Sequence, residues 1–224
     1  MKFKRLSIFL VSSILFLFHL KCFAVGLPAE DFDEVVGNLF WNELYKSGGW
    51  TLYCGYRFNP EAVIADYGVV VIEQLYPLDK MLKQMQCQSR KQCRQEKSTT
   101  FSRMEADMHN LYPVWQEVQI LRRDNPYGEI EGEDWRFSDC DFEKRLNIIE
   151  PRPIARGNIA RAMLYMYKQY GLPLSKQTLR LMIEWHQNDP PSKQERIRND
   201  VIEELQGSRN LFIDQPEKAK SLLK

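Results

Sequence analysis

The stretch at residues 68–77, Gly-Val-Val-Val-Ile-Glu-Gln-Leu-Tyr-Pro, decides how the rest of this chain of 224 residues is interpreted. The β-branched run from Val69 to Ile72 has the length and composition of a β-strand. Glu73 and Gln74 follow the run directly, so both polar side chains are expected at the end of that strand. An exposed or salt-bridged acid is the ordinary interpretation of Glu73, and a binding or catalytic acid is the alternative.

Asn110 is a second polar candidate, 37 residues after Glu73. Apolar residues recur at helical spacing over residues 104–111, which predicts a helix there. Asp107 and Asn110 are three residues apart and would share another face of that helix. Glu73 and Asn110 both offer oxygen atoms that a hard divalent cation accepts, whereas a turn or capping role is the ordinary interpretation of Asn110.

The last third of the chain is predicted to be helical. One helix is expected over residues 153–170, ending before Gly171, and a second from Ser175 toward His186. Ser192 and Glu195 resemble a capping box for a third helix that reaches Gln206. Strands followed by these helices predict a mixed α+β fold in a single domain over residues 25–224.

The first 24 residues have the pattern of a signal peptide. A basic start precedes an apolar run at residues 6–20, and Cys22-Phe23-Ala24 offers small residues for cleavage after Ala24. Export to a periplasm or out of the cell is therefore expected, with an uncleaved anchor as the alternative. No later run approaches 18 apolar residues, so no membrane association is expected after cleavage.

The cysteines that remain after cleavage are even in number, as in proteins bound for an oxidising compartment. They are Cys54, Cys87, Cys93 and Cys140. Three pairings are open. We favour Cys87–Cys93, which closes a short polar loop, together with Cys54–Cys140; a zinc site is the weaker alternative because no Cys-x₂-Cys pair is present.

Charge is segregated along the chain. The formal net charge of +1 falls to about −3 once the four basic residues of the signal segment are removed, so global charge does not indicate a nucleic-acid binder. Residues 80–103 nevertheless carry seven basic residues and one acid, and residues 128–143 carry seven acids and one arginine. The basic segment can bind phosphates, or it can be a solvated face.

Four sequence blocks together resemble the bacterial endonuclease I family, whose members are exported nucleases with a ββα-metal site. The blocks occur in order at residues 72–77, 103–113, 155–166 and 205–210, reading IEQLYP, RMEADMHNLYP, ARGNIARAMLYM and LQGSRN. The second and third blocks are the most specific. The resemblance covers most of the mature chain and implies a metal-dependent, sequence-nonspecific endonuclease that acts on DNA, and on RNA as a further option.

The resemblance also implies site residues. Glu73 and Asn110 would bind one Mg²⁺, Ca²⁺ or Mn²⁺ ion, and Arg90, before the second loop cysteine, would clamp a phosphate of the nucleic-acid backbone. Gln74 occupies the position at which the family has its catalytic histidine. An amide can orient a water molecule but cannot take its proton, so the rate is expected to fall by about 10²- to 10⁴-fold.

Two neighbouring groups could replace the missing base. His109 is the first and is more typical of a structural histidine; Asp107 is the second. A further departure follows Glu117-Val118, where Gln119-Ile120-Leu121-Arg122-Arg123 replaces an Asn-Gly-Asp-Arg-like stretch.

These observations leave three hypotheses. The first is an exported endonuclease, and the second is a catalytically impaired nuclease fold that binds nucleic acid or another partner. The third is an exported α+β domain whose charged segments contact proteins, which does not explain the sequence blocks. The sequence does not indicate an oligomeric state.

Overall fold

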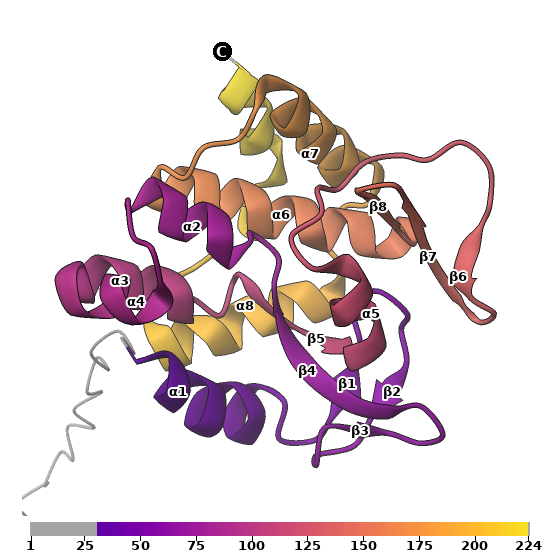
Figure 1. The fold of residues 1–224 in the computed structure, drawn as a ribbon, viewed down its shortest axis with the longest axis horizontal. Helices are drawn as coiled ribbons and strands as arrows, with labels where there is room; N and C mark the ends of the chain where they lie inside the picture. Colours follow the sequence, from indigo (N-terminus) through magenta and orange to yellow (C-terminus); the bar gives the residue numbers. More distant parts are fainter. Residues whose placement is uncertain (1–30, 224) are drawn as a thin grey trace, which may run out of the picture.

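Short antiparallel sheets and helices build the part of the chain that the computed structural model describes, residues 31–223 (Figure 1). The mixed α+β class expected from the sequence is confirmed. The expected signal peptide, residues 1–24, lies outside the described residues. Among residues 31–223, no helix combines the length and the apolar character needed to cross a membrane.

The stretch around Glu73 forms the central strand of a three-stranded sheet. Strand β4 (Gly68–Gln74) pairs antiparallel with β3 (Val63–Ile64) and with β5 (Leu111–Trp115). Helix α5 (Gln116–Arg122) follows β5 directly and packs against β4. The strand expected over residues 69–72 is confirmed, and its polar end lies beside a helix.

The helix expected over residues 104–111 is wrong beyond its first residues. Helix α4 (Ser98–Ala106) ends at Ala106, and a turn leads into β5. Met108 and Leu111 are buried because they pack in one cluster with Phe40, not because they continue the helix. Pro113 is accommodated because β5 is an edge strand, so its missing N–H costs no ladder bond.

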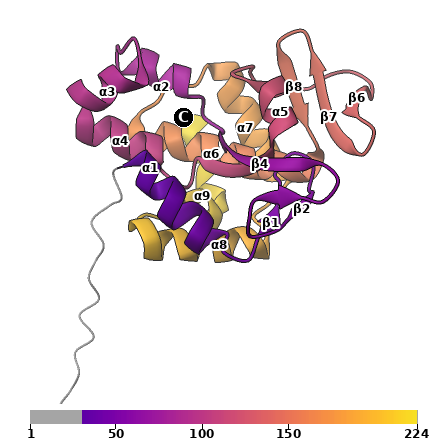
Figure 2. The same cartoon turned by 60° about the horizontal axis from the view of Figure 1, so that its bottom comes forward.

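Helices of the N-terminal half lie on one side of the molecule. Helix α1 (Phe32–Glu34) continues into the π-helical segment η1 (Val35–Leu44), which packs against α8. Helices α2 (Leu78–Gln84), α3 (Arg90–Glu96) and α4 gather at one end of the molecule, opposite β6, β7 and β8, in all views (Figures 1 and 2).

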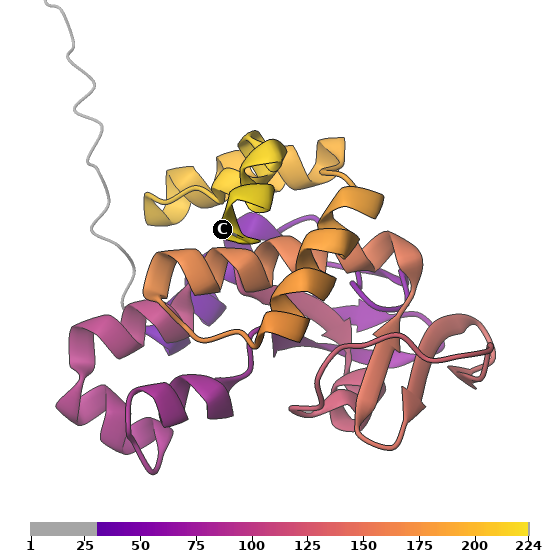
Figure 3. The same ribbon diagram turned by 90° about the horizontal axis from the view of Figure 1, so that it is seen from above.

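The C-terminal part of the chain contains α6 (Pro153–Tyr170), α7 (Lys176–Asn188), α8 (Lys193–Gln206), α9 (Leu211–Asp214) and the 3₁₀ segment η2 (Pro216–Leu223). The first three are the helices that the sequence predicts. Gly171 and Gly207 end α6 and α8 in the left-handed region, and Ser175 caps α7. Ser192 and Glu195 form the expected capping box. Helix α7 lies across α6 (Figure 3), and Trp185 is buried in the same core as Met163.

Two further small sheets are tied together by a disulfide. The first pairs β1 (Gly49–Trp50) with β2 (Arg57–Phe58), and the second has the order β6 (Trp135–Phe137), β7 (Cys140–Arg145) and β8 (Ile148–Pro151). Cys54 and Cys140 form a disulfide, and Cys87 and Cys93 form a second one, which is the pairing that we favoured from the sequence.

Candidate functional site

A cavity of about 690 Å³ opens beside the polar end of β4. Its wall includes Glu73 and Gln74 from β4 and Arg90 from α3. The structure therefore brings together three of the residues singled out in the sequence. The remaining polar wall comes from α5 and the turn after it, with Gln119, Arg122, Arg123 and Asp124.

Glu73 is paired with Arg122 in the wall of this cavity. Only 4% of Glu73 and 2% of Arg122 are exposed, and the guanidinium donates a hydrogen bond to the carboxylate. Burial raises the pKa of Glu73 to about 7, although Arg122 and a hydrogen bond from Gln119 oppose that rise. Glu73 is thus a buried carboxylate that titrates near neutral pH.

Arg122 also fastens the end of β4 to the start of the following loop. Its guanidinium donates to the backbone carbonyls of Leu75, at 2.9 Å, and of Arg123, at 2.7 Å. The ring of Tyr127 lies 4.9 Å from the Arg122 guanidinium carbon, a cation–π contact. Arg122 therefore has a structural role besides supplying a charge, because it joins α5, β4 and the next loop.

The side-chain amide of Gln119 lies on the same side of Glu73. Its nitrogen donates to the backbone carbonyl of Ile72 at 2.6 Å, and the same side chain donates to the Glu73 carboxylate. The carboxylate of Glu73 therefore accepts hydrogen bonds from two side chains, the cationic Arg122 and the neutral Gln119.

A hydrogen bond to the backbone of α4 holds the side chain of Gln74. Its side-chain nitrogen donates to the backbone carbonyl of Glu105 at 2.9 Å. Gln74 also lines the cavity, and the oxygen of its amide is a hydrogen-bond acceptor. An amide in this place can orient a water molecule, but it offers no proton acceptor of useful strength.

Arg90 reaches the cavity while it is paired with a buried acid. Glu105 is fully buried and forms salt bridges with both Arg90 and Arg94, the latter at 2.7 Å. The guanidinium of Arg90 lies 4.9 Å from the ring of Phe32, and 40% of the Arg90 side chain is exposed. Part of the guanidinium is therefore accessible to an anion in the cavity.

Asn110, the other expected metal ligand, does not line the cavity together with Glu73. Its side chain is fully buried and bonds the backbone of Tyr76 in both directions. The amide oxygen accepts from the Tyr76 N–H at 2.6 Å, and the amide nitrogen donates to the Tyr76 carbonyl at 3.1 Å. The function of Asn110 in the fold is to hold the chain after β4 against the start of β5.

Asp107 and His109 also lie away from the cavity, so neither can replace the missing base there. Asp107 accepts hydrogen bonds from the hydroxyls of Tyr165 and Tyr170 at 2.8 and 2.7 Å, beside a separate cavity of about 340 Å³. His109 contacts the Ser208 carbonyl at 3.0 Å, and burial lowers the pKa of His109 to about 4. The histidine is therefore neutral and structural.

Sequence reasoning gave no role to the α5 side of the cavity. Gln119, Arg122 and Arg123 stood out only as a departure from the expected stretch, and Asp124 not at all. Gln119 and Arg122 reach Glu73 because α5 packs on β4, and no local pattern in the sequence signals that packing.

Comparison with known proteins gives the family. Residues 35–217 match the family model described as Endonuclease I. An extracellular deoxyribonuclease of Aeromonas hydrophila is 34% identical over 196 residues, which cover 77% of this chain and 84% of that protein. A periplasmic deoxyribonuclease of the same organism is 33% identical over 195 residues, covering 77% and 81%. Endonuclease-1 of Buchnera aphidicola subsp. Acyrthosiphon pisum (strain APS) is 30% identical over 183 residues, covering 78% and 70%.

Proposed function

The chain belongs to the endonuclease I family, and on that premise we propose that it is an exported endonuclease that hydrolyses phosphodiester bonds of DNA at the cavity beside Glu73. The relatives named deoxyribonucleases support DNA as the substrate. Their extracellular and periplasmic names, together with two disulfides in this chain, support export.

Phosphate recognition is assigned to the arginines that reach the cavity. Arg90 and Arg123 both line it, and Arg123 follows the last residue of α5 with a backbone φ of +50°. Guanidinium groups bind phosphate oxygens in a fork geometry. Contacts of this kind position the backbone without reading bases, so cleavage without sequence preference is expected.

Proton transfer is assigned to Glu73. With its pKa near 7, this carboxylate is half deprotonated at neutral pH, which suits a general base. Gln74, the neighbouring residue, orients the attacking water through its amide oxygen. Glu73 then takes a proton of that water as the water oxygen bonds to phosphorus, while the arginines stabilise the negative charge on the phosphate. The bond between phosphorus and the leaving sugar oxygen breaks, and solvent supplies the proton for that oxygen.

A metal ion is common to the family, but the residues around Glu73 do not fit the ligand pair that the resemblance implies. Asn110 is bonded to the Tyr76 backbone, and Glu73 already has Arg122 as its counter-ion. A divalent ion at Glu73 would face that guanidinium at close range. The proposed steps therefore use only side chains of this chain, and the assay compares Mg²⁺ with EDTA.

The buried, near-neutral carboxylate beside the arginines is the observation that carries the proposal. Its test is nicking of supercoiled plasmid by the oxidised protein from residue 25 onward, with Mg²⁺ and with EDTA. Glu73→Gln is expected to lower the rate at least ~100-fold. Glu117→Gln, an exposed acid on α5 outside the cavity, is the matched control and is expected to cut like the wild type. Equal rates for all three proteins would overturn the assignment.

A second function is favoured by Gln74, because an amide cannot take the proton of the attacking water. If Glu73, which is paired with Arg122, does not take that proton either, the cavity binds phosphate without cleaving the nucleic acid. The chain would then be a nucleic-acid-binding protein, with affinity that falls as salt rises.

Fluorescence anisotropy with labelled DNA separates the two functions. Binding without nicking, weakened by Arg90→Ala, would support the second function. Nicking that Glu73→Gln abolishes would support the first.

A further inference from the structure

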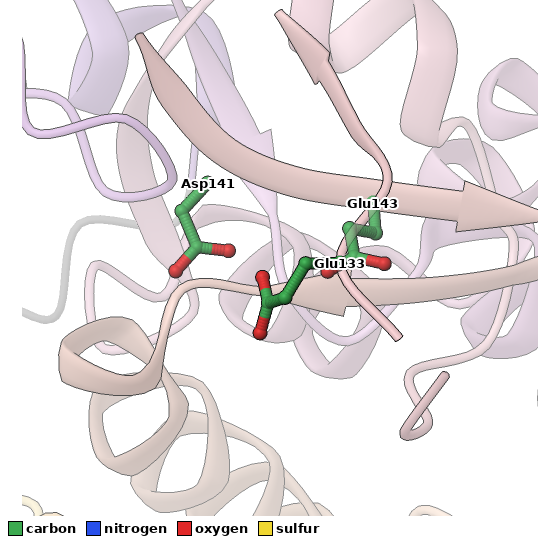
Figure 4. A group of neighbouring side chains, drawn as sticks. All are labelled: Glu133, Asp141 and Glu143. Atoms are coloured by element: carbon green, nitrogen blue, oxygen red, sulfur yellow. The ribbon is translucent and has the colours of Figure 1, made fainter. Parts of the chain in front are cut away.

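Three carboxylates gather at the hairpin of β6 and β7, away from the cavity beside Glu73. Glu133 precedes β6, and Asp141 and Glu143 lie two apart on β7, so their side chains share one face of the strand. One oxygen atom from each lies within 4.8 Å of the others. Figure 4 shows the three carboxylates near one another, two on β7 and one on the segment before β6.

The carboxylate of Glu143 is the observation that distinguishes this group from an ordinary acidic surface. Only 3% of Glu143 is exposed, and its Oε2 atom is buried without a hydrogen-bond partner. A backbone N–H of Asp134 serves the carboxylate, which leaves the second oxygen unsatisfied. A buried acceptor without a donor is costly, and a cation is the ligand that would satisfy it beside two more carboxylates.

The three acids have few compensating partners: Arg152 and Arg156 act on Asp141 from a distance, and the Trp135 ring N–H donates to Glu133 at 2.8 Å. Within residues 31–223, none of the three carboxylates forms a salt bridge with a lysine or arginine. Arg136 donates to the carbonyl of Lys144, and Arg156 is paired with Glu150. Burial first, and then the neighbouring acids, raise the pKa of both Asp141 and Glu143. The group is therefore held together against its own repulsion.

We propose that Glu133, Asp141 and Glu143 form a binding site for one Ca²⁺ ion that braces the β6–β7 hairpin. All three ligands are carboxylates, the class that hard cations prefer. The group contains no cysteine or histidine, the ligands that would favour zinc. Calcium tolerates irregular geometry, whereas magnesium demands a near-ideal octahedron. Extracellular modules bind Ca²⁺ with Kd on the order of 10⁻⁴ to 10⁻³ M, and an affinity in that range is expected here.

The hairpin connects this site to the helix that forms one wall of the cavity. Lys144 of β7 donates to the Leu121 carbonyl of α5 at 2.8 Å, and Phe137 of β6 packs 4.8 Å from the ring of Trp115. Asp141 directly follows Cys140, which is bonded to Cys54. A bound ion would therefore stabilise the β6–β7 hairpin, which Lys144 joins to α5.

The test is titration of the oxidised protein from residue 25 onward with CaCl₂ by calorimetry, with MgCl₂ as the comparison. Wild type is expected to bind one Ca²⁺ ion and to unfold at a higher temperature in Ca²⁺ than in EDTA. Glu143→Gln is expected to weaken Ca²⁺ binding at least ~10-fold and to remove the thermal shift. Glu131→Gln, an exposed acid of the same segment, is the matched control and is expected to bind like the wild type.

Two results would overturn this proposal. One is the absence of saturable Ca²⁺ binding to folded wild type at millimolar concentrations. The other is binding that Glu73→Gln removes and Glu143→Gln leaves intact, which would place the ion at the cavity. Asp141→Asn provides a second variant if Glu143→Gln does not fold, and it is expected to weaken binding in the same way.

Discussion

Arg122 donates a hydrogen bond to the carboxylate of Glu73, and both side chains are almost completely buried in the wall of one cavity. The pair joins α5 to the end of β4 across 49 residues of sequence. Burial raises the pKa of Glu73 to about 7, and the guanidinium opposes that rise. The pair also gives Glu73 a resident cation.

Removal of Arg122 is expected to destabilise the protein strongly. Arg122→Met leaves the Glu73 carboxylate buried without its counter-ion, which costs about 3–5 kcal/mol of the free energy of unfolding at pH 8. The loss is smaller at pH 5, because Glu73 is protonated well below its pKa of about 7. Urea unfolding at both pH values measures it.

The double variant Glu73→Gln, Arg122→Met is the control for that experiment. It is expected to recover part of the loss and not all of it, because the bonds from Arg122 to the carbonyls of Leu75 and Arg123 are also gone. A single variant as stable as the wild type at pH 8 would contradict the pairing.

Asn110 is expected to act on stability and not on metal affinity. Asn110→Ala removes two buried hydrogen bonds to Tyr76 and leaves that backbone N–H and carbonyl without partners, which costs about 2–4 kcal/mol. Denaturant unfolding with and without Mg²⁺ checks this. An Mg²⁺-dependent stabilisation that is present in wild type and lost in Asn110→Ala would restore the ligand role.

The two disulfides are expected to differ in their contribution to stability. Cys54–Cys140 spans 86 residues and Cys87–Cys93 only 6. Chain entropy then predicts losses of about 4–5 kcal/mol and about 2 kcal/mol for the respective double-serine variants. Unfolding of the two variants under the same conditions gives the comparison, and a larger loss for the short loop would reverse it.

A histidine at position 74 is expected to raise the rate of plasmid cleavage. In the Gln74→His variant, one ring nitrogen can donate a hydrogen bond to the Glu105 carbonyl while the other accepts a proton from water. The gain is expected to be on the order of 10²-fold. An unchanged rate from a folded variant would mean that water does not approach along this side chain.

Local signals in the sequence predicted much of the fold. The β-branched run before Glu73 specified β4, and the caps at Ser175 and Ser192 specified the starts of two helices, because each depends on near neighbours in the chain. Four cysteines left only three pairings, so the disulfides were also within reach.

The candidate site was harder to predict from the sequence, because contacts between residues far apart in the chain form it. Met108 and Leu111 have helical spacing, yet the pairing of β5 with β4 ends the helix at Ala106 and turns Asn110 toward Tyr76. Arg122 faces Glu73 only because α5 packs on β4. Neither contact leaves a local pattern in the sequence.

The central claim is that Glu73 takes the proton in the cavity, and the pH dependence of plasmid nicking tests it most directly. A base with a pKa of about 7 is mostly protonated at pH 5 to 6, so the rate is expected to rise about tenfold per pH unit there and to level off above pH 8. Glu117→Gln is expected to follow the same curve. A rate for Glu73→Gln that matches the wild type, or a wild-type profile that is flat between pH 5 and 8, would contradict the claim.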